Sequence, residues 1–130
     1  MNDLIVLDTH PFVWYYDHSP SLSTVARRII DEGFRGERTI LVPTVVVTEA
    51  IGVDAKHRLR IDFQGFLDDL ERTGFRLLPF DEPILRRYLT ITARLDIFDR
   101  MIVATALVYN ASVVTKDEKI VASATVPVVW

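Results

Sequence analysis

An apolar run near the start of the sequence ends in a carboxylate: residues 4–7 read LIVL, and Asp8 follows. A strand that is buried on both faces has such a continuous run, whereas a strand with one solvated face alternates apolar and polar residues. Further apolar or partly alternating runs occur at residues 40–42, 75–80, 112–115 and 126–130. Because Pro127 removes a main-chain donor, the last run is expected at an edge of the sheet.

Segments with helical periodicity separate these runs. One is expected between a cap at Ser21 and a stop at Gly33, with Val25, Ile29 and Ile30 facing inward. Others are expected to begin near Pro43 or Thr44 and to cover residues 60–73, 83–94 and 98–109. The last is apolar nearly all round, which places it in the centre of the domain or in an interface. Alternating strands and helices predict an α/β protein with three layers, α/β/α, around a central parallel sheet of four to five strands.

Length and composition restrict the classes that remain. With 130 residues, the chain has the size of one domain, 1–130. Cysteine is absent, which excludes disulfides, thiolate zinc sites and a cysteine nucleophile. No apolar run approaches the roughly 18 residues that span a bilayer, and the first residues lack the basic region of a signal peptide. A soluble, cytoplasmic protein without a membrane partner is therefore expected.

The net charge of −3 argues at first against a nucleic-acid partner. Twelve of the 15 basic residues, however, are arginines, whose planar guanidinium group suits phosphate better than the lysine ammonium does. A metal ion bound by several acids would also offset part of the negative charge. A polyanionic substrate is therefore compatible with the composition.

Four acidic residues are expected at the carboxyl edge of the sheet, where parallel α/β proteins bind ligands. Asp8 and Asp117 follow two of the strands, while Glu49 and Asp99 lie in the helices that begin near residues 44 and 98. Converging carboxylates form an oxygen-rich site that suits Mg²⁺ or Mn²⁺. Such a metal activates water and neutralises a pentavalent phosphate, so phosphodiester hydrolysis is the natural reaction.

These residues also have structural interpretations. Asp8 can be a turn residue, Asp99 can favour the helix dipole, and Asp117 can cap the segment that follows it. Glu49 differs, because an unpaired charge in the apolar context VVVTEAIG is costly. Asp96 is predicted mainly as a helix N-cap. The hydroxyls of Thr9 and Thr115 can support the neighbouring acids, or can make ordinary turn and strand hydrogen bonds. The three histidines are expected to be surface or loop residues.

Four segments together resemble the acidic motifs of the PIN domain family, and specifically its VapC-like toxins: VLDTH (6–10), VTEAIG (47–52), FDRMIVATA (98–106) and VVTKDEKI (113–120). The resemblance implies a metal-dependent endoribonuclease of a toxin–antitoxin pair. It assigns Asp8, Glu49, Asp99 and Asp117 as the acids that bind Mg²⁺ or Mn²⁺, and Thr115 as the hydroxyl that supports the fourth. Asp96 is retained as a fifth metal ligand. Phe98 stands where many relatives have a histidine, so any substrate contact by that imidazole is missing.

The resemblance further implies a single-stranded or looped RNA substrate, a cognate antitoxin partner and a homodimer. The aromatic cluster Phe12, Trp14, Tyr15 and Tyr16 is compatible with a buried interface and equally with core packing. The alternative function is a catalytically inactive PIN-like scaffold that binds RNA or protein. A receiver domain needs an acidic pair at the first strand, which offers only Asp8. A haloacid-dehalogenase-like phosphatase needs an aspartate where His10 stands.

Overall fold

The computed structural model describes residues 4–130, and a five-stranded sheet forms its centre. All neighbouring strands pair in parallel, in the order β3-β2-β1-β4-β5. The strands are β1 (Ile5–Leu7), β2 (Ile40–Pro43), β3 (Phe75–Leu78), β4 (Ser112–Val114) and β5 (Val128–Val129). The predicted parallel sheet is therefore confirmed. Strand β5 lies at the edge, as the proline that precedes it predicts.

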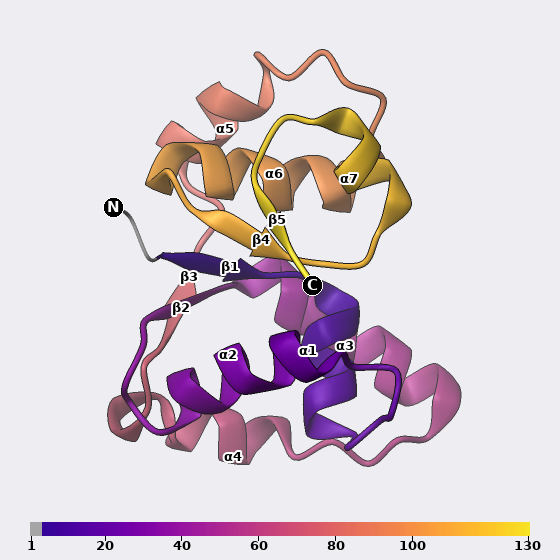
Figure 1. Cartoon of the computed structure of the whole chain (residues 1–130), viewed down its shortest axis with the longest axis vertical. Helices are drawn as coiled ribbons and strands as arrows, with labels where there is room; N and C mark the ends of the chain where they lie inside the picture. Colours follow the sequence, from indigo (N-terminus) through magenta and orange to yellow (C-terminus); the bar gives the residue numbers. More distant parts are fainter. Residues whose placement is uncertain (1–3) are drawn as a thin grey trace.

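Helices cover both faces of the sheet (Figure 1). They are α1 (Thr9–Tyr16), α2 (Thr24–Phe34), α3 (Thr44–His57), α4 (Phe63–Asp68), α5 (Glu82–Tyr88), α6 (Ile97–Tyr109) and α7 (Glu118–Ser123), with a 3₁₀ turn, η1 (Leu70–Arg72). In Figure 1, α1, α2 and α4 lie on one side of the sheet, and α5, α6 and α7 lie on the other. This confirms the α/β/α layers. No helix within residues 4–130 is long and apolar enough to cross a membrane.

The core follows the apolar runs. Strand β1 is buried along its whole length, because a neighbouring strand pairs with each of its edges and helices cover both of its faces. Helix α6 buries five consecutive residues, 102–106, and contacts α3, α5, β1 and β4. The prediction that this helix lies centrally is confirmed. Burying consecutive residues requires neighbours on several sides of the helix, which is why its sequence is apolar nearly all round.

Side-chain caps begin several of the helices. The residues Ser23, Asp62, Asp81, Asp96 and Asp117 each accept a hydrogen bond from a main-chain N–H in the first turn that follows. The predicted capping roles of Asp96 and Asp117 are confirmed. Because a cap satisfies main-chain donors that lack a helical partner, these positions fix where the helices start.

Helix α2 differs in detail from the prediction. Its N-cap is Ser23 rather than Ser21, and it continues through Gly33 to Phe34. Gly33 is buried within the helix, and a Cβ atom at this position would overlap the Ile40 side chain, so the glycine serves close packing rather than termination. With this start, Ala26, Ile29 and Ile30 face the core, whereas Val25 is 37% exposed. The inward position assigned to Val25 is therefore wrong.

The predicted helix over residues 60–73 is also too long. Arg60 has a positive φ of 64°, which is incompatible with a right-handed helix, and Asp62 caps the short helix α4 instead. Only the 3₁₀ turn η1 continues this segment toward β3. The strand predicted over residues 75–80 ends two residues early, at Leu78, and Pro79 follows it.

The helix predicted over residues 83–94 ends at Tyr88 as α5. Leu89 lies beyond it and is 77% exposed, and Leu85 within it is exposed as well. The physical reason lies in a later residue. The Arg100 guanidinium donates to the carbonyls of Ile91 (2.6 Å), Ala93 (2.9 Å) and Leu95 (3.3 Å), and so stabilises an irregular segment between α5 and α6.

The aromatic cluster after Asp8 forms the short helix α1, which the sequence did not indicate. Phe12 is fully buried and contacts the rings of Tyr16, Phe63 and Phe66, so core packing accounts for it. Trp14 is only partly buried and contacts Trp130 edge-on at 5.9 Å between ring centroids. The cluster is thus divided between the core and the molecular surface.

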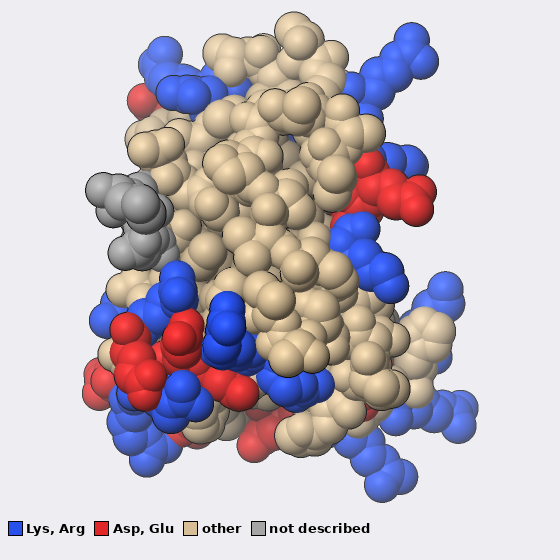
Figure 2. All heavy atoms as spheres, in the orientation of Figure 1, with Lys and Arg blue, Asp and Glu red and all other residues tan. Residues whose placement is uncertain are grey.

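Charged side chains gather at one corner of the face shown in Figure 2, whereas the centre of that face carries few of them. At the end of α2, ion pairs join Arg35 to Glu37 (2.8 Å) and Arg38 to Glu32 (3.0 Å). Such solvent-accessible pairs contribute little to stability.

Candidate functional site

The strand order creates a crevice at the carboxyl ends of β1 and β4. From β1 the chain moves outward through β2 to β3, and then returns to the other side of β1 for β4 and β5. Connections on the two sides of this switch point diverge, and ligands in open α/β sheets bind where they part. Asp8 directly follows β1, and Asp117 lies three residues after the end of β4. Both predicted acids therefore flank the switch point.

Asp8 is buried and held by hydrogen bonds on both carboxylate oxygens. Its Oδ1 accepts from the Thr9 N–H at 2.7 Å, and its Oδ2 accepts from the Thr115 hydroxyl at 2.6 Å. The Thr115 oxygen in turn accepts from the Asp117 N–H at 2.9 Å. The Thr115 side chain thus links the segments that follow β1 and β4. Burial raises the pKa of Asp8 above its usual range, although the Thr115 and Thr9 donors oppose that shift.

Glu49 projects toward the same region from α3. The Thr9 hydroxyl donates to Glu49 Oε1 at 2.5 Å, and Thr9 also supplies the N–H that binds Asp8. Thr9 therefore orients two of the predicted acids at once. Close packing of α1 against α3 brings these residues together across 40 positions of sequence.

Asp99 lies in the first turn of α6, where its N–H donates to Asp96 Oδ1 at 2.8 Å. Burial, and then the negative charges of Asp117, Asp96, Asp8 and Glu49 in that order, raise the pKa of Asp99 to about 7. The other four acids singled out from the sequence thus all lie within electrostatic reach of Asp99. Within residues 4–130, none of them forms an ion pair with lysine or arginine.

The donor set fits a hard divalent cation. All five side chains offer carboxylate oxygens, the ligands that Mg²⁺ and Mn²⁺ prefer, and their mutual repulsion is the condition that such a cation relieves. In the described part of the chain, no three acidic or histidine side chains converge closely enough to hold an ion as they stand. Small rotations of these side chains would therefore have to accompany metal binding.

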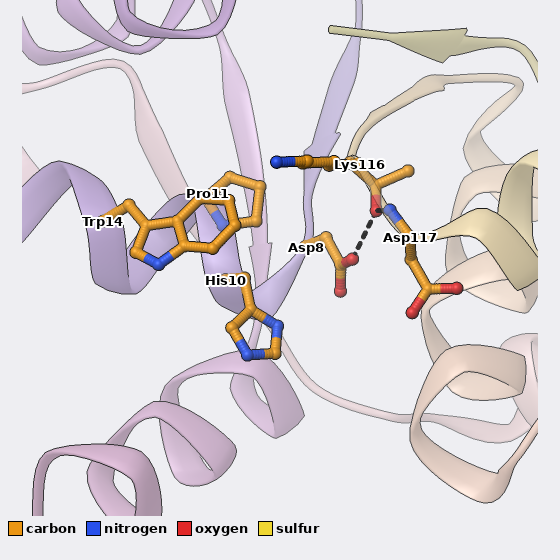
Figure 3. A pocket seen from close by; sticks show the side chains of 7 residues that line it. Asp8, His10, Pro11, Trp14, Lys116 and Asp117 are labelled. Carbon is orange, nitrogen blue, oxygen red and sulfur yellow. Dashed lines mark hydrogen bonds between the residues drawn. The ribbon is translucent and has the colours of Figure 1, made fainter. Parts of the chain in front are cut away.

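A cavity of about 260 Å³ opens beside these acids (Figure 3). Its lining consists of Asp8, His10, Pro11, Trp14, Thr115, Lys116 and Asp117. Sequence reasoning left out His10, Trp14 and Lys116 as contributors to the site. The i, i+4 spacing of His10 and Trp14 would have indicated a shared helix face next to Asp8, had the helix α1 been recognised.

The sequence matches the PIN domain family over residues 5–124. No functionally curated protein matches it significantly. Solved structures share its fold. DNA-bound VapBC from Salmonella typhimurium is 17% identical, with 98% of each chain covered and a TM-score of 0.71, and VapBC2 from Rickettsia felis bound to a promoter DNA fragment is 19% identical, with 97% of each chain covered and a TM-score of 0.69. A toxin–antitoxin complex from Klebsiella pneumoniae is 16% identical, with 97% of this chain and 96% of that chain covered and a TM-score of 0.69. Because the family match spans all five acids and most of the chain, the protein belongs to the PIN domain family.

Proposed function

We propose that the protein is a Mg²⁺- or Mn²⁺-dependent endoribonuclease that hydrolyses phosphodiester bonds in RNA. The observation that carries this proposal is the position of Asp99, whose carboxyl group lies among four other acids at the switch point of a parallel sheet. Electrostatic crowding of this kind lowers stability, and a bound cation would relieve it. Membership of the PIN domain family supports the same reading.

Asp8, Glu49, Asp99 and Asp117 would hold the metal, with Asp96 as a fifth ligand. When bound, the divalent cation supplies a nucleophilic water and neutralises the charge that develops on the phosphate. The chain itself contributes orientation. Hydrogen bonds from Thr115 and Thr9 orient the Asp8 and Glu49 carboxylates before substrate arrives, which reduces the reorganisation that these two groups need.

The first experiment measures cleavage of an end-labelled single-stranded RNA with Mg²⁺ or Mn²⁺, and with EDTA. Activity should require the cation, and Asp8→Asn, Glu49→Gln, Asp99→Asn and Asp117→Asn should each lower the rate by at least ~10², the loss typical of a removed charge-stabilising group. Asp62→Asn is the matched control, because Asp62 caps the exposed start of α4 and asparagine caps equally well. Full activity in EDTA would refute the proposal.

The alternative, an inactive scaffold that binds RNA or protein, differs from a nuclease in its metal binding. Calorimetry with Mn²⁺ should show binding to the wild-type protein and much weaker binding to Glu49→Ala. RNA binding without any Mn²⁺ binding or cleavage would favour the scaffold.

We further propose that the nuclease is the toxin of a toxin–antitoxin pair, acts as a homodimer in the cytoplasm, and is silenced by a cognate antitoxin. Two of the similar structures are VapBC assemblies, and a third is a toxin–antitoxin complex. Induced expression of the wild-type chain in a bacterial host should arrest growth, and expression of Asp99→Asn should not. Light scattering should give twice the monomer mass. Unchanged growth with an active nuclease would exclude the toxin role.

A further inference from the structure

The cavity beside the acids has two chemically different walls (Figure 3). Asp8 and Asp117 form one wall. The other consists of Trp14, His10 and Pro11 from α1. The rings of His10 and Trp14 lie 5.5 Å apart between centroids, one helical turn from each other. An aromatic surface next to a carboxylate cluster is not needed to hold a metal ion, so it requires another explanation.

The Trp14 side chain is held by a contact with the ring of Trp130. Trp130 supports the indole edge-on, with the ring planes at 64°, and the side chain is only partly buried. Part of the indole packs against the core, whereas Phe12 on the same helix is fully buried, so Trp14 leaves part of its surface on the cavity wall. An indole on the wall of an open cavity presents a flat apolar surface.

Lys116 adds the only lysine or arginine to the described lining of this cavity. It lies between Thr115 and Asp117, yet its ammonium group points toward the indole, 5.9 Å above the Trp14 ring centroid (Figure 3). Within residues 4–130, it forms no ion pair with a carboxylate. The ammonium is exposed and can exchange its contact with the ring for a contact with an anion.

We propose that this cavity is a nucleotide subsite, in which the Trp14 indole stacks on one unpaired base of the RNA and the Lys116 ammonium pairs with an adjacent phosphate. The inference rests on the proposed nuclease function, and assigns to Trp14 and Lys116 a part in binding the single-stranded or looped RNA that the family resemblance implies. Stacking needs an unpaired base, because a paired base presents only its edges. Stacking also tolerates any base, since each has a π-face, so this subsite selects strand state rather than sequence. At about 260 Å³, the cavity suits one planar ring system.

Stacking is tested by fluorescence in a background that does not cleave. Trp130→Phe combined with Asp99→Asn leaves Trp14 as the only tryptophan. In Mg²⁺, an eight-nucleotide single-stranded RNA should quench its emission in a saturable manner, and the same sequence annealed into a duplex should not. Anisotropy of a fluorescein-labelled strand should show that Trp14→Leu raises Kd about tenfold, the loss typical of one base–aromatic stack. Trp14→Tyr should retain most of the affinity.

The phosphate contact is tested by salt dependence. Lys116→Gln should reduce the slope of log Kd against log salt by about 0.7, the value for one lost phosphate contact on a single strand. Lys119→Gln is the matched control, because Lys119 is an exposed lysine of α7 outside this cavity, and its slope should stay at the wild-type value. Lys116 is exposed, so its replacement tests the subsite even if Trp14→Leu fails to fold.

Kinetics with the intact metal site separate the two proposals. Trp14→Leu and Lys116→Gln should change KM more than kcat, because the subsite binds substrate before and during the reaction alike. If the wild-type protein cuts RNA while Lys116→Gln and Trp14→Leu bind and cut normally, the subsite is wrong and the nuclease proposal stands. If single strands quench Trp14 but no variant or metal gives cleavage, the nuclease proposal fails and the subsite stands. Equal quenching by duplex and single strand would overturn the subsite.

Discussion

Replacing Asp99 by asparagine should stabilise the metal-free protein at pH 8 and change its stability little at pH 5. The folded protein raises the pKa of Asp99 from 3.8 to about 7. Taken at face value, this shift corresponds to about 4 kcal/mol of unfavourable interaction with the ionised side chain. Asp99 is only half-buried, and solvent screening reduces the expected gain for Asp99→Asn to about 1–2 kcal/mol.

The direction in which the free energy of unfolding changes with pH follows from proton uptake by Asp99. Between pH 3.8 and about 7, the native Asp99 carboxyl binds a proton that the unfolded chain has lost. The native state therefore binds more protons, and the free energy of unfolding must fall as pH rises through this window. Above pH 7 the Asp99 carboxyl is ionised in both the native and the unfolded state, and the free energy of unfolding falls no further through this group. Asparagine cannot ionise, so the variant lacks this part of the pH dependence.

Urea unfolding in EDTA at pH 5, 6, 7 and 8 measures the effect. Glu118→Gln serves as the control, because Glu118 is an exposed acid in the first turn of α7. It should lose a few tenths of a kcal/mol from the helix-dipole interaction, with no step in the loss between pH 5 and pH 8. A difference between wild type and Asp99→Asn that stays constant from pH 5 to pH 8 would refute the electrostatic reasoning.

With bound metal, the wild-type protein should become more stable than Asp99→Asn. Free Mg²⁺ or Mn²⁺ at 100 times its dissociation constant should stabilise the wild-type protein by about 2.7 kcal/mol. Asp99→Asn should gain less, because it lacks a ligand. If the melting temperature of the wild-type protein does not respond to either cation, the crowded acids have no role in metal binding.

Substitutions at four further positions test individual parts of the structure by urea unfolding, and the one at Asp96 is also tested by cleavage activity. Thr115→Val should cost about 1–3 kcal/mol, because it removes the buried hydroxyl that joins Asp8 to the Asp117 N–H, and Thr115→Ser should restore most of that loss. Gly74→Ala should cost more than ~3 kcal/mol, because a Cβ atom would overlap the main-chain carbonyl of Arg38. A loss below ~1 kcal/mol would contradict that packing. Arg100→Met should lower stability by about 1–3 kcal/mol through its lost carbonyl contacts, and unchanged stability would contradict the anchoring role. Asp96→Asn should keep the cap within a few tenths of a kcal/mol and retain most cleavage activity, and an inactive Asp96→Asn would instead establish it as an essential ligand.

Local signals predicted the elements that depend on local contacts. Asp96 and Asp117 cap the helices that follow them, because a short polar side chain reaches main-chain donors two or three residues ahead. The continuous apolar run of β1 indicated a strand covered on both faces. The end of α5 could not be predicted in this way. It depends on Arg100, which lies twelve residues beyond Tyr88 and supplies the hydrogen bonds that continued helix would otherwise make.

Sequence alone determined the parallel α/β architecture and the residue types of the candidate site, because burial on two faces and acidic residues after strands leave local patterns. Only the tertiary structure decided which groups surround each acid. The Thr9 hydroxyl meets Glu49 across 40 residues, and the Thr115 hydroxyl meets Asp8 across 107. It also decided that Trp14 and Lys116 share the cavity beside these acids. Such contacts arise from the packing of α1 on α3 and the pairing of β1 with β4, and no spacing along the chain specifies them.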